Sequence, residues 1–183
     1  MGSFAIPMSR RRFLGRLAAG AGLLALLPRR ALPAAGEERR LSLVNTHTGE
    51  RLELAYFRDG SYLEDALARA ERFLRDFRTG ESHAIDPALL DLLFALVLAT
   101  GSNAPFQIVS GYRSPRTNDA LRARGGGQAK NSLHLQGRAA DVRLADVPTP
   151  RLWDAALSLA RGGVGYYRAE DFVHVDTGRV RRW

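Results

Sequence analysis

The sequence predicts an α+β fold in which a small antiparallel β-sheet is flanked by helices. Two patterns predict this class. Apolar residues recur every three or four positions in some segments, which is typical of amphipathic helices, and alternate with polar residues in others, which is typical of strands. The chain of 183 residues is long enough for one domain with a hydrophobic core, and it shows no internal repeat or second domain boundary. Helices combined with mostly antiparallel strands indicate the α+β class.

The first elements that we expect are a hairpin and a helix. Apolar and polar residues alternate over residues 41–44 and 52–56, and the stretch 45–49 between them is polar, so we expect two strands joined by a turn. Apolar residues at helical spacing then run from 62 to 77 and stop before Gly80, which predicts an amphipathic helix.

A second helix and a third strand follow. Asp86 is suited to cap a helix that has Pro87 at its first position, and the strongly apolar segment after it ends at Gly101. Residues 106–109 predict a short buried strand that runs directly into residues 110–113.

The remaining elements are marked by prolines at helix starts and by glycines between elements. They are a helix from Ser114-Pro115 through about Arg124, a flexible loop at 125–127, a strand at 139–144, a helix from Thr149-Pro150 through Leu159, a break at Gly162-Gly163, and a hairpin with strands at 164–167 and 172–176.

The formal net charge of +8 is concentrated in the first residues of the chain. Six arginines and no acidic residue fall within 1–36, which leaves 21 basic and 19 acidic groups in the other 147 residues, a net charge of +2. We therefore expect no nucleic-acid partner. The chain contains no cysteine, which excludes disulfides, thiolate zinc sites and thiol nucleophiles.

The same first residues have the organisation of an export signal. Arginines 10–12 precede an apolar run at 17–27 and small residues at 31–36, and the paired arginines are typical of the twin-arginine class. The apolar run is shorter than the roughly 20 residues that span a bilayer. We predict a twin-arginine signal peptide at 1–36 and a mature domain at 37–183. That domain would be periplasmic and would keep no stable membrane anchor after cleavage. A basic amphipathic helix is the alternative interpretation of the first segment.

Two histidines and an aspartate predict a metal site. His134, Asp141 and His174 make a three-ligand set that suits one zinc ion and leaves a fourth position for water, as in catalytic zinc sites. Strand alternation over 172–176 places His174 and Asp176 on one face, with valines on the core face. A lone histidine is more often structural, but the string Ser-x-His-x-x-Gly-x-Ala-x-Asp is far more specific. The set therefore indicates a hydrolase.

Six strings of the sequence carry a resemblance to a known family. They are LVNTHTG at 43–49, IVSGYRS at 108–114, LRAR at 121–124, SLH at 132–134, GVGYY at 163–167 and FVHVDTG at 172–178. These strings resemble zinc peptidases that include D-Ala-D-Ala peptidases, phage endolysin endopeptidases and the hedgehog fold, and within that group the MepK-type murein endopeptidases. The resemblance spans essentially the whole predicted mature domain.

The resemblance implies both a fold and an activity. It implies that His134, Asp141 and His174 are the ligands of one zinc ion, and that the small antiparallel sheet forms the floor of the metal cleft. It implies peptidoglycan as the substrate and cleavage of the link between two meso-diaminopimelate residues, an L,D (3-3) bond. It also places Arg113 over the cleft, where it would bind the developing oxyanion or a substrate carboxylate. A surface salt bridge is the alternative for Arg113.

The sequence offers several candidates for the other catalytic and binding residues. Peptide hydrolysis needs a proton shuttle near the nucleophilic water. Asp171 is the first candidate, because many relatives of the family carry their catalytic acid three residues before the second histidine ligand. Asp176 is the rival, with an alternative role in orienting His174, and Glu170 is third. Ser132 is expected to bind substrate or to stabilise its turn, and Tyr112 to line the cleft or to pack in the core.

We therefore expect a monomeric, periplasmic, zinc-dependent murein endopeptidase. Two other functions remain open from the sequence. The same zinc site would serve a D,D-carboxypeptidase or D,D-endopeptidase that acts on D-Ala-linked stem peptides. A domain without catalytic activity that binds cell wall and keeps zinc for stability is the third possibility.

Overall fold

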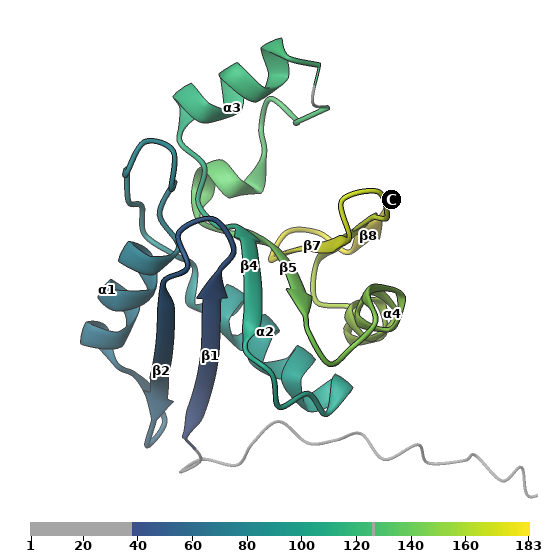
Figure 1. Cartoon of the computed structure of the whole chain (residues 1–183). Helices are drawn as coiled ribbons and strands as arrows, with labels where there is room; N and C mark the ends of the chain where they lie inside the picture. The colour runs from purple at the N-terminus through teal and green to yellow at the C-terminus, as the bar shows by residue number, and fades with distance from the viewer. Residues whose placement is uncertain (1–37, 126) are drawn as a thin grey trace, which may run out of the picture. The chain divides into compact units, whose positions relative to one another are not determined.

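One eight-stranded sheet organises the part of the chain that the computed structural model describes, residues 38–125 and 127–183 (Figure 1). The strands run in the order β3-β2-β1-β4-β5-β7-β6-β8. The elements in chain order are β1 (Arg39–Asn45), β2 (Arg51–Arg58), β3 (Ser61–Tyr62), α1 (Glu64–Phe73), α2 (Pro87–Thr100), β4 (Phe106–Ser110), α3 (Pro115–Ala123), the short 3-10 helix η1 (Leu133–Gln136), β5 (Ala139–Leu144), α4 (Thr149–Leu159), β6 (Gly163–Tyr167), β7 (Phe172–Asp176) and β8 (Arg181–Arg182). The α+β prediction is confirmed, whereas the predicted signal peptide lies outside the described residues.

The sheet is larger and less uniformly antiparallel than the sequence predicts. The β1–β2 and β6–β7 hairpins are antiparallel as expected, but β1 pairs with β4 in parallel and β6 with β8 in parallel. The chain between β1 and β4 passes through two helices, which gives it the length that a parallel crossover needs. The alternation of residues locates a strand, but it does not reveal which strand lies beside it.

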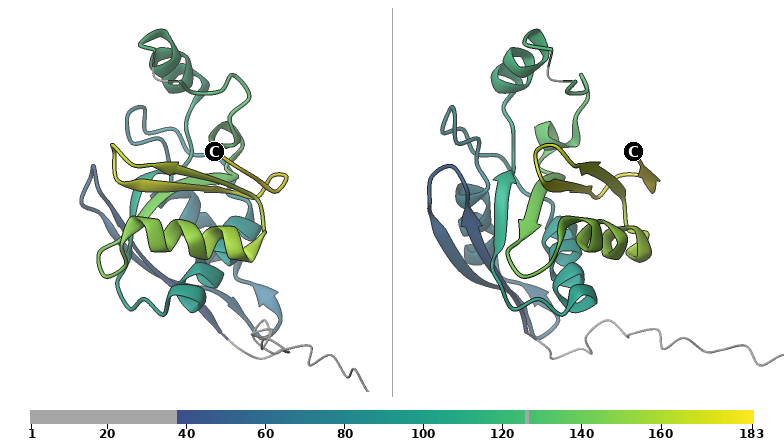
Figure 2. Two further views of the ribbon diagram at one scale, coloured as in Figure 1. Left: turned by 90° about the vertical axis from the view of Figure 1, so that its right-hand side faces the viewer. Right: turned by 45° about the vertical axis from the view of Figure 1, so that its right-hand side comes forward.

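Helices cover one face of this sheet and leave part of the other face for the site. Directly paired residues share a face, so Ile108, Val142 and Val173 form one continuous apolar row. Helix α1 contacts β2, α2 contacts β1, and α4 contacts β5, β6 and β7 on this side. Figure 2 shows α4 alongside the β6–β7 hairpin and next to α2. Residues that alternate with the apolar row, Asp141 and His174 among them, therefore point away from the helices.

Helix α2 is the central helix of the core. Leu89, Leu90, Leu93 and Leu96 are completely buried, as expected of a helix that is apolar on all sides. The Asp86 carboxylate accepts a hydrogen bond from the Ala88 N–H at 3.0 Å and caps the helix as predicted. None of the described helices is long and apolar enough to span a bilayer.

Helix α1 is shorter than the predicted 62–77 because the chain turns sharply around Asp76. The carboxylate of Asp76 accepts hydrogen bonds from the backbone N–H of Arg78 at 2.9 Å and from the N–H and hydroxyl of Ser114 at 2.9 and 2.8 Å. The Leu74 carbonyl accepts a hydrogen bond from the Tyr112 N–H at 2.7 Å. These bonds tie the segment after α1 to the segment after β4, which carries Arg113.

Gly111 lets these two segments approach each other closely. A Cβ at this position would lie 2.5 Å from the Leu74 carbonyl oxygen and 3.0 Å from the Leu74 Cβ. Only glycine fits against that backbone without moving it. The glycine of the Ser-Gly-Tyr-Arg string is therefore required by packing.

Asp76→Asn is predicted to destabilise the fold by about 2 kcal/mol at pH 7, because it weakens buried hydrogen bonds to a charged acceptor. Burial raises the pKa of Asp76, but hydrogen bonds from Thr117, Ser114 and Arg78 outweigh burial and lower the pKa below its usual value. The ionised carboxylate thus stabilises the fold above the unfolded-state pKa of about 3.9. That contribution is lost as the pH falls through the folded-state pKa.

Urea unfolding of the wild type and Asp76→Asn at pH 7 and at pH 3 measures both effects. The difference in unfolding free energy should be largest at pH 7 and should be reduced at pH 3, which lies below the unfolded-state pKa. Asp154→Asn, at an exposed position of α4, is the control and should change stability by less than about 0.5 kcal/mol. Equal stabilities of the wild type and Asp76→Asn at pH 7 would contradict this account.

Candidate metal centre

His134, Asp141 and His174 come together from three separate elements, η1, β5 and β7. Asp141 and His174 are directly paired across the β5–β7 ladder. The Asp141 Oδ1 lies 2.9 Å from His174 Nδ1 and 3.3 Å from His134 Nε2, and these two ring nitrogens are 3.1 Å apart. All three residues are buried, and one atom from each points to a common centre.

The geometry of this group fits a zinc ion. Ligand atoms about 2.0–2.1 Å from a tetrahedral zinc lie about 3.3 Å from one another. The three observed separations, from 2.9 to 3.3 Å, are close to that value. Two imidazoles and one carboxylate are also a donor set that catalytic zinc sites use.

The second nitrogen of each imidazole is held by an acceptor behind the ring. His134 Nδ1 lies 2.7 Å from the Gly111 carbonyl oxygen, and His174 Nε2 lies 3.1 Å from Asp176 Oδ2. These contacts orient the rings so that His134 Nε2 and His174 Nδ1 both face Asp141. Acceptors of this kind fix the tautomer and the direction of metal-binding histidines in zinc proteins.

The carboxylate of Asp176 is itself fixed by several hydrogen bonds. It is completely buried and accepts hydrogen bonds from the N–H groups of Gly163 and Gly178, at 3.0 and 2.8 Å, and from both terminal nitrogens of Arg181, at 3.0 and 2.6 Å. Burial raises the pKa of Asp176, but the hydrogen bonds from His174 and Arg181 outweigh burial and hold the pKa well below its usual range. The carboxylate is therefore a fixed anion that supports His174.

The centre favours an ionised Asp141. Burial opposes ionisation, but the charge and hydrogen bonds of His134 and His174 outweigh burial and hold the pKa of Asp141 well below its usual range. Burial also lowers the pKa of His174, and its hydrogen bonds to Asp141 and Asp176 raise the pKa by more. An anionic carboxylate between two imidazoles provides the charge that a divalent cation requires.

Arg113 lies beside this group. Its Nη2 is 3.7 Å from Asp141 Oδ2, and its Nη1 donates a long hydrogen bond of 3.5 Å to the side-chain oxygen of Asn118. The buried Nε–H of Arg113 has no acceptor among the described residues. Burial lowers the pKa of Arg113, and the charge of Asp141 opposes that effect. A buried donor without a partner is uncommon in proteins and is suited to bind a ligand oxygen.

The three residues open onto a cavity of about 300 Å³ that has one polar and one aromatic wall. The polar wall includes Arg113, Gln128, Asn131 and Ser132, and the aromatic wall consists of Tyr167, Phe172 and Trp183. Tyr167 and Phe172 stack at 4.6 Å, and the Tyr167 hydroxyl accepts a hydrogen bond from the Trp183 indole N–H at 3.2 Å.

Trp183 lines the cavity as well, although the sequence did not predict it as a residue of the site. Its ring centroid lies 5.2 Å from that of His174, and about half of the residue is exposed. A Cβ at Gly165 would lie 2.6 Å from the indole, so only glycine leaves room for this ring. A glycine within a strand often marks a close approach of this kind, and it was the one signal in the sequence.

The other predicted site residues lie at different distances from the cavity. Ser132 lines it, and its hydroxyl also accepts a long hydrogen bond from the His134 N–H at 3.4 Å. Tyr112 is buried and stacks on His83 at 4.9 Å, and it is not one of the cavity residues. Asp171 lies in the turn before β7, outside the cavity, where its largely exposed carboxylate accepts a hydrogen bond from the Thr149 hydroxyl.

Comparison with known proteins gives a consistent result. The family model described as "Peptidoglycan L,D-endopeptidase MepK" matches residues 33–183. A protein of Escherichia coli (strain K12) with that name is 41% identical over 177 residues, which cover 96% of this chain and 97% of the relative. A Haemophilus influenzae protein named "Probable peptidoglycan L,D-endopeptidase MepK" is 36% identical, and the alignment covers 97% of this chain and 97% of the relative.

One solved structure is also similar in part. The crystal structure of the Serratia marcescens L-Ala D-Glu endopeptidase ChiX aligns with a TM-score of 0.39 and 21% identity. The alignment covers 51% of this chain and 80% of that chain.

His174→Ala is predicted to abolish stoichiometric zinc binding, because it removes one of three converging ligands. The wild type should keep about one zinc per chain after dialysis against metal-free buffer, measured by elemental analysis. His47→Ala is the matched control, since His47 is exposed and stacks on Phe77. Equal zinc contents in His174→Ala and the wild type would contradict the proposed ligand set.

Proposed function

The chain belongs to the MepK family of peptidoglycan L,D-endopeptidases, and we propose that it is a zinc-dependent hydrolase of peptide cross-links in peptidoglycan. The observation that carries this proposal is the convergence of His134, Asp141 and His174 at the base of an open cavity. A bound zinc would supply a Lewis acid and lower the pKa of a coordinated water to about 7. The role of the chain is to hold the ligands, orient the substrate and move a proton.

Arg113 is the residue that we assign to the substrate carbonyl or to a substrate carboxylate. Its unpaired Nε–H and its position 3.7 Å from Asp141 support this role. A guanidinium in a largely enclosed site stabilises a developing oxyanion more strongly than it would in water. The same charge also balances part of the anionic Asp141 while no substrate is present.

We propose the meso-diaminopimelate–meso-diaminopimelate (3-3) bond as the substrate. This residue combines an aliphatic chain with charged ends, so it needs both an apolar surface and polar partners. The aromatic wall formed by Tyr167, Phe172 and Trp183 offers the apolar surface, and Arg113 and Ser132 offer the polar partners. Tyr112 would hold the segment that carries Arg113 against the core rather than touch the substrate.

The proton shuttle is assigned to Asp171 rather than to Asp176. The Asp171 side chain is 65% exposed, so solvent reaches it directly; its carboxylate accepts a hydrogen bond from the Thr149 hydroxyl and lies 3.9 Å from Arg143 Nη1. Asp176 is enclosed by four donor groups, which favours a positioning role for it behind His174. Asp171 does not line the cavity, so this role requires its carboxylate to move toward the cavity when substrate binds.

Export and processing complete the proposal. Residues 1–36 would direct the chain to the periplasm through the twin-arginine route, and residues 37–183 would act there as a monomer without a membrane anchor. Fusion of residues 1–36 to a folded reporter tests this step, because retention of the reporter in the cytoplasm would contradict it.

Digestion of purified sacculi, followed by chromatography of the muropeptides, tests the function. The zinc-loaded protein is predicted to remove dimers linked through two diaminopimelate residues, and His134→Ala should leave them intact. Loss of only D-Ala-linked dimers would indicate a D,D-peptidase instead. Unchanged muropeptides together with retained sacculus binding would indicate a cell-wall-binding domain.

Two amide substitutions separate the shuttle from the positioning residue. Asp171→Asn should lower kcat by about 10²-fold or more with full zinc content, because it removes proton transfer. Asp176→Asn should weaken zinc affinity by about 10- to 100-fold, because the support of His174 is lost, and excess zinc should restore much of its activity. Full turnover by Asp171→Asn would exclude Asp171 as the shuttle.

A further inference from the structure

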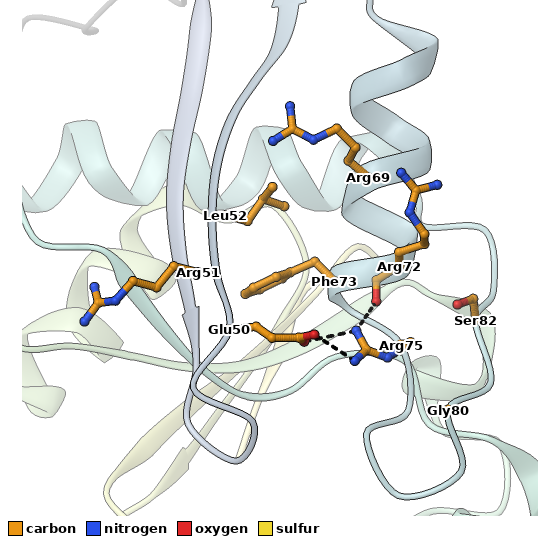
Figure 3. A pocket seen from close by; sticks show the side chains of 9 residues that line it. All are labelled: Glu50, Arg51, Leu52, Arg69, Arg72, Phe73, Arg75, Gly80 and Ser82. Carbon is orange, nitrogen blue, oxygen red and sulfur yellow. Dashed lines mark hydrogen bonds and ion pairs between the residues drawn. The ribbon is translucent and has the colours of Figure 1, made fainter.

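A second, strongly basic groove lies between β2, α1 and the loop that follows α1 (Figure 3). It encloses about 580 Å³. The residues that line it are Glu50, Arg51, Leu52, Arg69, Arg72, Phe73, Arg75, Gly80 and Ser82. It shares no lining residue with the cavity at the candidate metal centre.

The groove carries a positive charge that the protein does not neutralise. Its single acidic residue, Glu50, forms two hydrogen bonds with Arg75, each of 3.0 Å. Arg51, Arg69 and Arg72 form no ion pair with any acidic residue of the described part of the chain. Arg51 points away from α1, to the other side of β2 (Figure 3). The charged side chains on the α1 side, Arg69, Arg72, Arg75 and Glu50, have a net charge of +2, as much as the whole predicted mature domain.

Arg69 and Arg72, three residues apart on α1, have no ion-pair partner in the described part of the chain, although Arg69 donates a hydrogen bond to the Glu53 carbonyl at 3.2 Å. Their positive charges repel each other, and a bound anion would remove that repulsion. Figure 3 shows the guanidinium groups of Arg69, Arg72 and Arg75 spread along the groove rather than directed at one point. Such spacing suits a chain with several separate negative charges better than a single compact anion.

The floor of the groove is apolar. Leu52 and Phe73 are buried, and they lie between the strand and the helix that carry the arginines (Figure 3). A ligand that matches the groove therefore has carboxylates or similar groups for the guanidinium forks and aliphatic parts for the floor.

The groove and the metal centre are linked by one short loop. Gly80 and Ser82 form one side of the groove, and Asp76 at the start of the same loop bonds the N–H and hydroxyl of Ser114. Ser114 directly follows Arg113, so a ligand held in the groove would be held by the same rigid unit as the cavity.

We propose that this groove binds the carboxylate-bearing stem peptides of peptidoglycan beyond the cross-link in the cavity, an inference that rests on the proposed function. Bidentate Arg–carboxylate pairs would supply affinity, and the open shape of the groove would accept stems of different length. The groove would hold the polymer, and the cavity would perform the cleavage.

The variant Arg69→Gln/Arg72→Gln tests this proposal in the full chain. It is predicted to weaken cosedimentation with purified sacculi at 4 °C by about 5- to 10-fold, and to slow digestion of sacculi by a similar factor. Turnover of a soluble dimer linked through two diaminopimelate residues should stay within twofold of wild type, because this small substrate needs only the cavity. The binding difference should shrink in 0.5 M salt, where exposed charges are screened.

Arg151→Gln/Arg161→Gln is the matched control, since it removes two exposed arginines on and next to α4 and should bind sacculi like the wild type. Equal sacculus binding by both double variants and the wild type would overturn the proposal. Loss of binding to phosphatidylglycerol vesicles, with sacculus binding retained, would also overturn it and assign the groove to a lipid surface. A wild type that leaves the soluble dimer intact would contradict the proposed function, whereas cosedimentation would still decide the role of the groove.

Discussion

The candidate centre depends on the antiparallel pairing of β5 with β7. This ladder sets Asp141 opposite His174 and, one residue further, Val142 opposite Val173. Because neighbouring residues of a strand face opposite sides of the sheet, the valines enter the core under α4 while the two polar residues face the cavity. A slip of one residue would turn His174 into the core, so the hydrophobic packing of the valines also specifies the direction of the ligand.

Burial of three polar side chains at one point is unfavourable unless each of them is well bonded. Here His134 is held by the Gly111 carbonyl, and His174 by Asp176, which in turn is held by Arg181 and two backbone N–H groups. The loop that supplies Gly111 is fixed by Asp76 on its other side. The centre is therefore the inner part of a continuous hydrogen-bonded network that extends to the basic groove.

Much of the fold and of the centre could be predicted from the sequence, and the failures have physical reasons. Local patterns located α2, its Asp86 cap and the β6–β7 hairpin, and the convergence of His134, Asp141 and His174 agrees with the ligand set expected from the strings. Local patterns do not report which distant strands pair, so the parallel β1–β4 contact was missed. Trp183 was missed because its partners, Gly165 and His174, come from other strands. The basic groove was missed for the same reason, since it forms only where α1 and the loop after it lie beside β2.

X-ray absorption spectroscopy of the zinc-loaded protein reports on the atoms that bind the metal. A zinc ion held by His134, Asp141 and His174 would give a four-coordinate shell of nitrogen and oxygen atoms at about 2.0–2.1 Å, with the multiple-scattering signal of two imidazoles. The signal of one imidazole should be lost in His134→Ala. A six-coordinate shell of oxygen atoms alone, or a spectrum that does not change in His134→Ala, would contradict a catalytic zinc held by these three residues.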